Sequence, residues 1–369
     1  MKVLITLPVK IGFDGMTKQV LSYARYMDKT DLEIDLLSCR GFDPNLREIV
    51  ENSGFNHIYR IECRDTNQLK YFIELLKLMK ERKYDVIHAN GQSATLAVEM
   101  IAGVLSGCKL RIAHSHNSMC LHQKAHKLLN PIFKITCNDA IACSKEAGDW
   151  LFGKRKYWIL KNGIDVEKFA FDHSCRKKYR EKLAIKENQI ALGNVAAFEP
   201  KKNQTFLIDI MNVLVRKNKN YILFLWGIDG SSKDAILKQI KELRLEDNVR
   251  YMGTTDKINE CINAMDLMLL PSWYEGFPVT LVEWQANGLE CLVSDTITSD
   301  CNISGKVEFL PINQGVDCWI EKICNAKMDL NERKSAENII CLRENGFDIK
   351  SNANELKQHY MLELNTKGR

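Results

Sequence analysis

The sequence predicts an α/β protein with two Rossmann-like domains, and three observations support that prediction. The chain has 369 residues, more than one hydrophobic core usually organises. Short apolar strands alternate with longer helical segments, which is the pattern of parallel sheets covered by helices on both faces. After a charged stretch at Asp172–Lys182, the pattern begins again at Ile190–Ala196. Because ligands bind beyond the carboxyl ends of such strands, we expect the two domains to face a cleft.

The first half of the chain supplies the strands and helices of the first predicted domain. Each predicted strand is a short apolar run, and a longer helical segment or a turn separates it from the next. The predicted strands are Lys2–Leu7, Ile34–Ser38, Val86–His88, Arg111–His114, Ala140–Ala142 and Tyr157–Leu160, and the helices include Met16–Met27, Thr66–Arg82 and Ala94–Leu105.

The second half repeats this organisation. We place the first domain at residues 1–170 and the second at residues 171–345, joined near 170–188. The strands predicted for the second domain are Ile190–Ala196, Tyr221–Trp226, Val249–Met252, Leu267–Leu270 and Cys291–Ser294.

Composition excludes several classes of protein. The 13 cysteines are scattered without a C-x-x-C pair, which argues against a zinc site and a disulfide framework and favours a reducing, cytoplasmic compartment. Met1–Pro8 is typical of a first strand rather than a signal peptide, and the apolar run Tyr221–Gly227 is too short to span a bilayer. The net charge of +5 permits phosphate ligands or an anionic membrane surface without requiring either. We predict no nucleic-acid partner.

The segment Leu270–Glu283 carries the most informative pattern. A buried strand ends at Leu270, Gly276 and Pro278 mark a turn, and a helix is predicted from Val279 onward. The backbone N–H groups at that helix start suit a phosphate. Glu275 lies in the loop, and Glu283 lies about 12 Å further along the helix. An elongated ligand with hydroxyls at both ends and negative charge between them, such as a nucleotide diphosphate sugar, fits this spacing. Two solvated glutamates on a surface helix are the alternative.

This segment resembles the Glu-x7-Glu motif of the retaining glycosyltransferases of family 4, which have the two-domain GT-B fold. The resemblance implies that Glu275 contacts the transferred sugar and that Glu283 holds the ribose of the donor. It also implies donor contacts from Gly276, Phe277, Pro278 and Val279. In GT-B enzymes the last helix crosses back to the first domain, so we expect a helix at 346–369 to pack there.

Lys202 and Asn203 open the helix that follows Ile190–Ala196, where a cation can neutralise a diphosphate. The segment Val195–Asn203 resembles the family element V-G-R-L-x-x-x-K-N, whose Arg and Lys clamp the donor diphosphate. Ala197 stands at the Arg position. Losing one charge-assisted contact costs about 1.5–3 kcal/mol. Compensation by the neighbouring Lys201 is the alternative, although a lysine cannot reproduce the bidentate fork of an arginine.

Two glycine loops also resemble elements of the family. Gly227 follows the strand Tyr221–Trp226, and a glycine there lets backbone approach a ligand, although a lone turn is the alternative. Gly15 matches the glycine loop after the first strand, near the donor phosphates and the acceptor. Thr17 stands in that loop where the family often has Glu.

The strand Arg111–His114 ends in a histidine, which we expect to face the cleft and to bond a sugar hydroxyl or a phosphate. The resemblance places a histidine near the reacting centre, and His114 is the best match, with His116 as the alternative. A metal site at this pair is not predicted, because no third ligand has a suitable spacing.

Two further segments support the resemblance to the glycosyltransferases of family 4. Asp139–Ser144 resembles the family pattern D-x-I-I-A-x-S, and Lys161–Phe169 resembles P-N-G-I-D-x-x-x-F. Together with Gly288–Asp295, which matches the strand after the second Glu, these elements follow the family order over most of residues 1–300. The segment from Ser294 to Leu310 is similar to the subgroup that acts in capsular and exopolysaccharide assembly.

The resemblance therefore implies transfer of a sugar from a nucleotide diphosphate sugar to a hydroxyl, with retention and without metal or cofactor. We predict Glu275, His114 and Lys202 as the catalytic residues. A glycosidase is a poor alternative. The two carboxylates of a glycosidase lie about 5–9.5 Å apart across one bond, whereas Glu275 and Glu283 are separated by about 12 Å along the helix. A degenerate protein that binds another transferase is the second alternative, which Ala197 and Thr17 keep open.

A basic and apolar stretch, His122–Lys134, suits a lipid-linked glycan acceptor and peripheral contact with the inner face of a membrane. A solvated helix is the alternative reading of this stretch.

Overall fold

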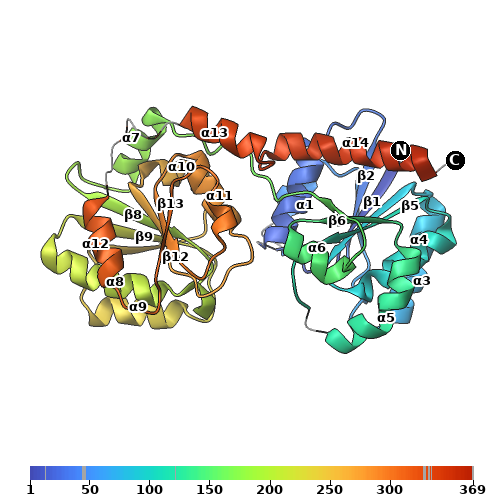
Figure 1. The fold of residues 1–369 in the computed structure, drawn as a ribbon, viewed down its shortest axis with the longest axis horizontal. Coiled ribbons are helices and arrows are strands. Elements are labelled where there is room, and N and C mark those ends of the chain that lie inside the picture. The colour runs from blue at the N-terminus through green and yellow to red at the C-terminus, as the bar shows by residue number, and fades with distance from the viewer. Residues whose placement is uncertain are drawn as a thin grey trace. The chain divides into compact units, whose positions relative to one another are not determined.

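The protein, described here from a computed structural model, forms two compact units (Figure 1). The structure describes residues 1–12, 14–43, 47–120, 122–326, 330, 333 and 335–367. Unit 1 consists of Met1–Gly163 and Asp348–Arg369, and unit 2 is Ile164–Phe347. The backbone therefore leaves unit 1 once and returns to it once.

Unit 1 is built on a seven-stranded sheet of order β3-β2-β1-β4-β5-β6-β7, in which every neighbouring pair is parallel. The strands are β1 (Lys2–Leu7), β2 (Glu33–Ser38), β3 (His57–Arg60), β4 (Val86–Gly91), β5 (Leu110–Ser115), β6 (Asp139–Ala142) and β7 (Trp158–Ile159). The helices are α1 (Gly15–Tyr26), α2 (Arg47–Glu51), α3 (Gln68–Arg82), the 3-10 turn η2 (Ala94–Leu96), α4 (Ala97–Ser106), α5 (Gln123–Thr136), α6 (Lys145–Phe152) and α14 (Ile349–Lys367).

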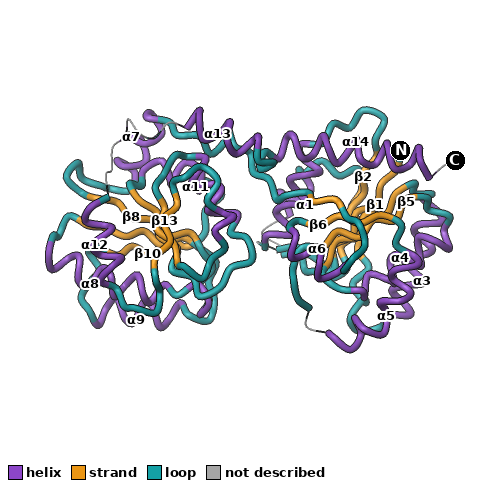
Figure 2. The backbone as a smooth tube through the Cα atoms, viewed as in Figure 1, coloured by secondary structure: helices purple, strands orange, loops and turns teal. Residues whose placement is uncertain are grey.

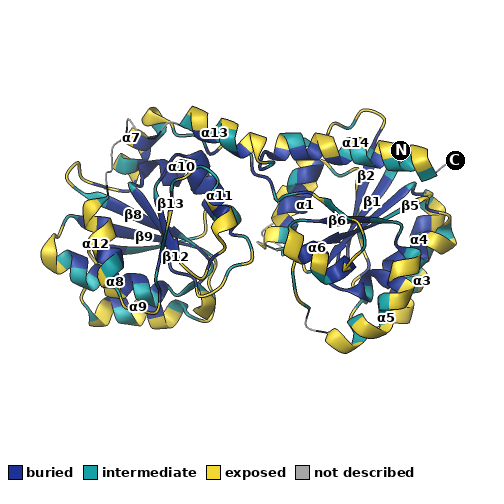
Figure 3. Cartoon of the chain, in the orientation of Figure 1, coloured by how far each residue is buried: buried dark blue, intermediate teal, exposed yellow. Residues whose placement is uncertain are grey.

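The sheet of unit 1 is buried on both faces, because successive side chains of a strand point to opposite sides. Val3 and Ile5 pack with α1 and α14 on one face, whereas Leu4 packs with α3 and α4 on the other. Continuous apolar strands of this kind are typical of parallel sheets between two helical layers. Figure 2 shows the helices around the strands, and Figure 3 shows that the strands lie in the buried interior.

Unit 2 contains a six-stranded sheet of order β10-β9-β8-β11-β12-β13, and its neighbouring pairs are parallel too. The strands are β8 (Ile190–Val195), β9 (Tyr221–Trp226), β10 (Val249–Gly253), β11 (Leu267–Leu270), β12 (Cys291–Ser294) and β13 (Val307–Leu310). The helices are α7 (His173–Lys182), η3 (Pro200–Lys202), α8 (Gln204–Lys217), α9 (Lys233–Glu242), α10 (Ile258–Cys261), η4 (Ile262–Ala264), α11 (Val279–Ala286), η5 (Ser299–Cys301), α12 (Asp317–Asn325) and α13 (Ser335–Glu344).

The prediction of two α/β Rossmann-like domains is confirmed, and the structure adds two strands. β3 and β13 are the outer strands of their sheets, and each has only four residues with a partly exposed side-chain pattern. Such short edge segments lack the apolar run by which the inner strands are recognised.

The units divide seven residues earlier than the sequence indicated, between Gly163 and Ile164 instead of after residue 170. The reason is packing, since Ile164, Val166 and Phe169 all lie in the hydrophobic core of unit 2. The second crossing falls after Phe347, and α14 then packs on unit 1 through the buried side chains of Leu356 and Tyr360. None of the helices within the described residues has the length and apolar character needed to cross a membrane.

Candidate active site

In unit 2 the loops after β8 and β11 lie at the point where the strand order reverses. From β8 the chain continues to β9 and β10 on one side of the sheet, and β11 then pairs with the other side of β8. Loops that leave neighbouring strands in opposite directions open a crevice at the carboxyl ends, where α/β sheets bind ligands. The predicted residues Lys202 and Glu275 belong to these two loops.

Lys202 and Glu275 are in direct contact. The Lys202 Nζ lies 2.5 Å from Glu275 Oε1, and the Ser272 hydroxyl donates a hydrogen bond of 2.7 Å to the same oxygen. The lysine side chain is 17% exposed and the glutamate side chain 9%, so the pair is only partly open to solvent. The sequence placed both residues near a donor, but their mutual ion pair and the bond from Ser272 are new features of the structure.

Backbone contacts hold these two loops together. The N–H of Trp273 donates to the carbonyl of Lys201 over 2.8 Å, and the side-chain amide of Asn203 donates to the carbonyl of Pro271 over 3.2 Å. Asn203 has a positive φ of 55°, a conformation that asparagine tolerates better than most residues. The predicted donor residue Asn203 therefore links the loops that carry Lys202 and Glu275.

The helix α11 is buried nearly all round, and Glu283 lies in its second turn with only 2% exposure. Both carboxylates of the Glu-x7-Glu segment are thus largely withdrawn from water, which excludes the reading of two solvated surface glutamates. Pro278 precedes the first turn of α11 and supplies no side-chain cap to its N–H groups, and the first turn carries no acidic residue.

Phe277 and Val279 lie on either side of Pro278, at the start of α11. The ring of Phe277 stacks on Phe347 at a centroid distance of 5.3 Å, and both Phe277 and Val279 pack against the core of unit 2. Their side chains therefore fix the loop before α11, whereas the backbone N–H groups of the helix start are the groups suited to an anion.

The predicted glycines Gly227, Gly276 and Gly15 differ in how much space surrounds the position that a Cβ would take. A Cβ on Gly227 would lie 1.9 Å from the carbonyl oxygen of Ala196, so close packing between the loops after β8 and β9 requires that residue. A Cβ on Gly276 or on Gly15 would meet no atom within 4 Å, and neither residue has a positive φ. Internal packing thus explains Gly227, whereas Gly15 and Gly276 border open space that a ligand can use.

Gly15 is the first residue of α1 and directly follows the loop that leaves β1. Asp14 caps this helix by accepting a hydrogen bond of 3.0 Å from the N–H of Thr17, and the Thr17 hydroxyl donates back to Asp14 over 2.6 Å. Thr17, which departs from the family pattern, is buried and therefore serves the helix start. Phe13 of this loop lies outside the described residues.

His114 is buried completely, which corrects the expectation that it faces a cleft. Its Nδ1 lies 3.0 Å from His88 Nε2, and His88 Nδ1 in turn lies 2.6 Å from the hydroxyl of Tyr360 in α14. The burial follows from the place of β5 inside the sheet, between β4 and β6. His114 Nε2 has no partner among the described residues.

His116, the alternative residue, is only partly buried. Its ring lies 4.1 Å from that of His114, and its Nε2 lies 2.8 Å from Asn90 Oδ1. Burial lowers the pKa of His88 and of His116 to about 3, and that of His114 well below its usual value. These imidazoles are therefore neutral near pH 7 and act through hydrogen bonds rather than charge.

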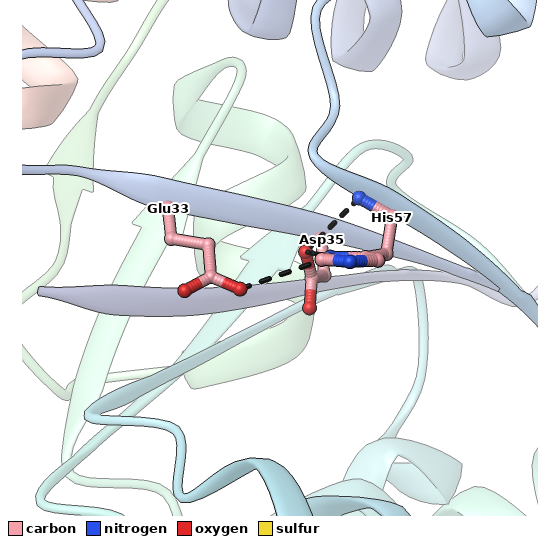
Figure 4. A group of neighbouring side chains, drawn as sticks. All are labelled: Glu33, Asp35 and His57. Carbon is pink, nitrogen blue, oxygen red and sulfur yellow. Dashed lines mark hydrogen bonds and ion pairs between the residues drawn. The ribbon is translucent and has the colours of Figure 1, made fainter.

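Elsewhere in unit 1, Glu33, Asp35 and His57 present three ligand atoms within 4.8 Å of one another (Figure 4). The guanidinium of Arg82 bonds Glu33 and lies 3.3 Å from Asp35 Oδ2 and 3.1 Å from His57 Nδ1. A side-chain cation thus already neutralises these carboxylates. Glu33 opens β2, so the cluster lies away from the carboxyl ends of the strands.

Each half of the chain matches a model of a known protein family. Residues 13–168 match the family model described as Glycosyltransferase Family 4, and residues 176–308 match the model described as Glycosyl transferases group 1. The chain is a glycosyltransferase of the GT-B fold. This glycosyltransferase is 29% identical over 325 residues to the putative glycosyltransferase EpsF of Bacillus subtilis, covering 85% of this chain and 84% of that protein.

A second relative is the UDP-Gal:alpha-D-GlcNAc-diphosphoundecaprenol alpha-1,3-galactosyltransferase of Escherichia coli. It is 24% identical over 364 residues, covering 94% of this chain and 93% of the relative. Among solved structures, HepE of Anabaena in complex with UDP-glucose superposes with a TM-score of 0.75 at 19% identity, covering 99% of this glycosyltransferase and 100% of that chain. WaaG, described as involved in lipopolysaccharide biosynthesis, gives a TM-score of 0.71 at 15% identity, covering 95% and 98%. These structural similarities establish the fold.

Proposed function

We propose that this glycosyltransferase moves a sugar from a nucleotide diphosphate sugar to a hydroxyl of a lipid-linked glycan, with retention of configuration, in surface polysaccharide assembly. The observation that carries the proposal is the contact between Lys202 and Glu275 at the strand-order reversal of unit 2. One cation and one carboxylate at that position match the charge and the hydroxyls of such a donor. The Escherichia coli relative, whose name specifies UDP-Gal and a diphosphoundecaprenol-linked acceptor, supports the same substrate classes.

In this proposal the donor replaces the internal ion pair. The diphosphate takes Lys202 and the uncapped N–H groups at the start of α11, and Glu275 is released to accept hydrogen bonds from hydroxyls of the transferred sugar. Glu283 holds the ribose. As the bond between the anomeric carbon and the diphosphate oxygen breaks, the acceptor oxygen bonds that carbon. Negative charge builds on the leaving diphosphate, and Lys202 stabilises that charge without a metal ion. The leaving phosphate accepts the proton of the acceptor hydroxyl.

Unit 1 is proposed to bind the acceptor. Open space beside Gly15 leaves room for substrate. The neutral imidazoles of His114 and His116 suit hydroxyl groups better than phosphates, because they offer hydrogen bonds without charge. His116 is partly exposed whereas His114 is fully buried, so we assign direct contact with substrate to His116, and His114 supports it from behind.

The exposed basic and apolar surface of α5 supports peripheral contact with a membrane. We place the enzyme at the cytoplasmic face, where nucleotide sugars are available to it and where a lipid-linked acceptor would be reached.

Nucleotide release from a panel of UDP-, GDP- and ADP-sugars tests the proposal. We expect one donor to be turned over, with release lost in Glu275→Ala and in Lys202→Ala. Lys201→Ala is the matched control, since Lys201 is the exposed neighbour of Lys202 and should leave release nearly unchanged. NMR of the product formed on an acceptor then reports the anomeric configuration, and an inverted product would refute retention.

A protein that only binds another transferase would behave differently. It would release no nucleotide from any donor and would give no calorimetric signal with the panel. That outcome would also mean that Ala197, in place of the family arginine, removes donor binding.

A further inference from the structure

Unit 1 contains a cavity of about 960 Å³ that shares no residue with the histidine cluster. Arg40 follows β2, Thr95 follows β4 and Gln123 follows β5, so the cavity lies at the edge of the sheet where the strands end. It is lined by Arg40, Arg64, Asp65, Gln68, Tyr71, Thr95, Val98, His122, Gln123, Lys124, Ala125, Leu128 and Leu129. A volume of this size is typical of a binding site for a small molecule or a large head group.

The cations of this cavity differ in how they are held. Arg64 Nε lies 2.9 Å from an oxygen of Glu99, a fully buried carboxylate that also accepts a bond of 2.8 Å from the Tyr71 hydroxyl. Arg64 is therefore a fixed guanidinium in the cavity wall. Arg40 pairs with Asp65 at 2.5 Å. Lys124 forms no ion pair within the part of the chain that the structure describes, so its charge is available to a ligand.

The first turn of α5 adds hydrogen-bond donors to this wall. His122 precedes the helix without capping it, and the first turn has no acidic residue. Positive charge from the helix start and from Lys124 therefore adds up at one end of the cavity. Gln68, Thr95 and Gln123 supply polar, uncharged groups of the kind that bond sugar hydroxyls.

An apolar stripe on α5 begins at the cavity. Leu128 lines the cavity and is 78% exposed, and it is followed on the same helical face by Ile132 at 43% and Ile135 at 82%. The exposed residues Lys127 and Lys134 flank this stripe. The outer surface of α5 is exposed in Figure 3, at the position labelled in Figure 1. Aliphatic side chains flanked by lysines are typical of a helix that lies in a membrane interface.

We propose that this cavity binds the diphosphate and first sugar of a lipid-linked acceptor, while the hydrocarbon chain lies along the α5 stripe. The inference rests on the proposed transfer to a lipid-linked glycan and names the residues that recognise it. A free diphosphate would leave the stripe without a role, and a neutral lipid would leave the charge of Lys124, unpaired among the described residues, without one. A lipid diphosphate that carries a sugar uses the cations, the polar groups and the stripe together.

Binding of the full-length protein to vesicles tests this inference. The probes are phosphatidylcholine vesicles, the same vesicles with a long-chain polyprenyl diphosphate, and vesicles with phosphatidylglycerol of equal charge. We expect the tightest binding to the polyprenyl diphosphate. Lys124→Gln should weaken that binding about fivefold and leave binding to phosphatidylcholine unchanged. The double variant Leu128→Ser/Ile135→Ser should weaken binding to all three.

Control variants separate these effects from a general loss of charge or apolar surface. Leu362→Ser removes an aliphatic side chain that is 65% exposed on α14, and Lys219→Gln removes an exposed lysine of unit 2; both should bind as wild type. Equal binding to phosphatidylglycerol and polyprenyl diphosphate, or an unchanged affinity for Lys124→Gln, would overturn the inference. Complete competition by inorganic diphosphate, with the double variant unaffected, would assign the cavity to a free phosphate instead.

Turnover of the donor is measured in a separate experiment, without vesicles. Nucleotide release from the donor without vesicles should be the same in Lys124→Gln as in wild type, whereas Glu275→Ala should lose release and still bind vesicles. Failure of the lipid inference therefore differs from failure of the proposed transferase activity.

Discussion

The two units of this glycosyltransferase have the same kind of parallel sheet, yet the loops of unit 2 and the inner strands of unit 1 carry opposite kinds of groups. Unit 2 presents the charged pair Lys202 and Glu275, whereas unit 1 presents imidazoles that burial keeps neutral. A charged pair suits a phosphate that must be bound and then stabilised as it leaves. Neutral imidazoles suit hydroxyl groups. The same architecture thus carries a charged pair in the loops of one unit and neutral imidazoles on the strands of the other.

The largest effect is expected when the charge of Glu275 is removed and its shape is kept. In Glu275→Gln we expect nucleotide release to fall about 10- to 100-fold, because a charge-assisted bond to the sugar is worth about 1.5–3 kcal/mol. Lys202 is then no longer held by a carboxylate, so the affinity for the nucleoside diphosphate product should rise a few fold. Calorimetry with that nucleotide measures the second effect. Weaker binding of the nucleotide would show that the ion pair does not compete with the donor.

Two glycine variants distinguish a glycine that close packing requires from a glycine that borders space for the donor. Gly227→Ala brings a Cβ against the backbone of Ala196 and should destabilise unit 2 by about 1–3 kcal/mol or more. Gly276→Ala meets only open space and should unfold as wild type does, while its KM for the donor rises. Urea denaturation and donor kinetics of both variants check this contrast. A stable Gly227→Ala or an unchanged KM in Gly276→Ala would break it.

The neutral imidazoles of unit 1 predict a pH dependence of stability. His88 titrates near 6.5 when unfolded but at about 3 when folded, so below pH 6.5 the unfolded chain binds more protons. Stability that is present above the unfolded pKa is lost as the pH falls toward 3, by about 2 kcal/mol for His88 at pH 5. Denaturation at pH 8, 6.5 and 5 measures the slope. His114→Gln should reduce that slope, and an equal slope in this variant would contradict the assignment.

The smallest expected effect concerns Tyr360. Tyr360→Phe removes the hydroxyl that contacts His88 Nδ1 and should cost about 1 kcal/mol of stability. If the hydroxyl also fixes which nitrogen of His114 carries a proton, transfer to an acceptor should slow while nucleotide release without acceptor stays the same. Leu364, which is only partly buried on the same helix, offers the control variant Leu364→Ala. Equal kinetics in both variants would limit Tyr360 to packing.

The sequence predicted the parts of this fold that depend on local pattern. The inner strands, the strand-turn-helix order and the position of Lys202 and Glu275 at strand ends follow from apolar runs and turn residues. The edge strands β3 and β13 were missed because they are short and partly exposed. The burial of His114 and its link through His88 to Tyr360 could not be predicted, since His88 and Tyr360 are 272 positions apart and meet only in the packed unit.

The return of the chain to unit 1 has a consequence for how the protein is made. Unit 2 is an insertion within unit 1, so a ribosome releases all of unit 2 before it releases α14. Unit 2 can finish folding during synthesis, whereas unit 1 must wait for its last helix to cover one face of its sheet. Until then the apolar surface around Ile5 and Val20 has no cover from α14. The first residues to be synthesised are therefore among the last to reach their final packing.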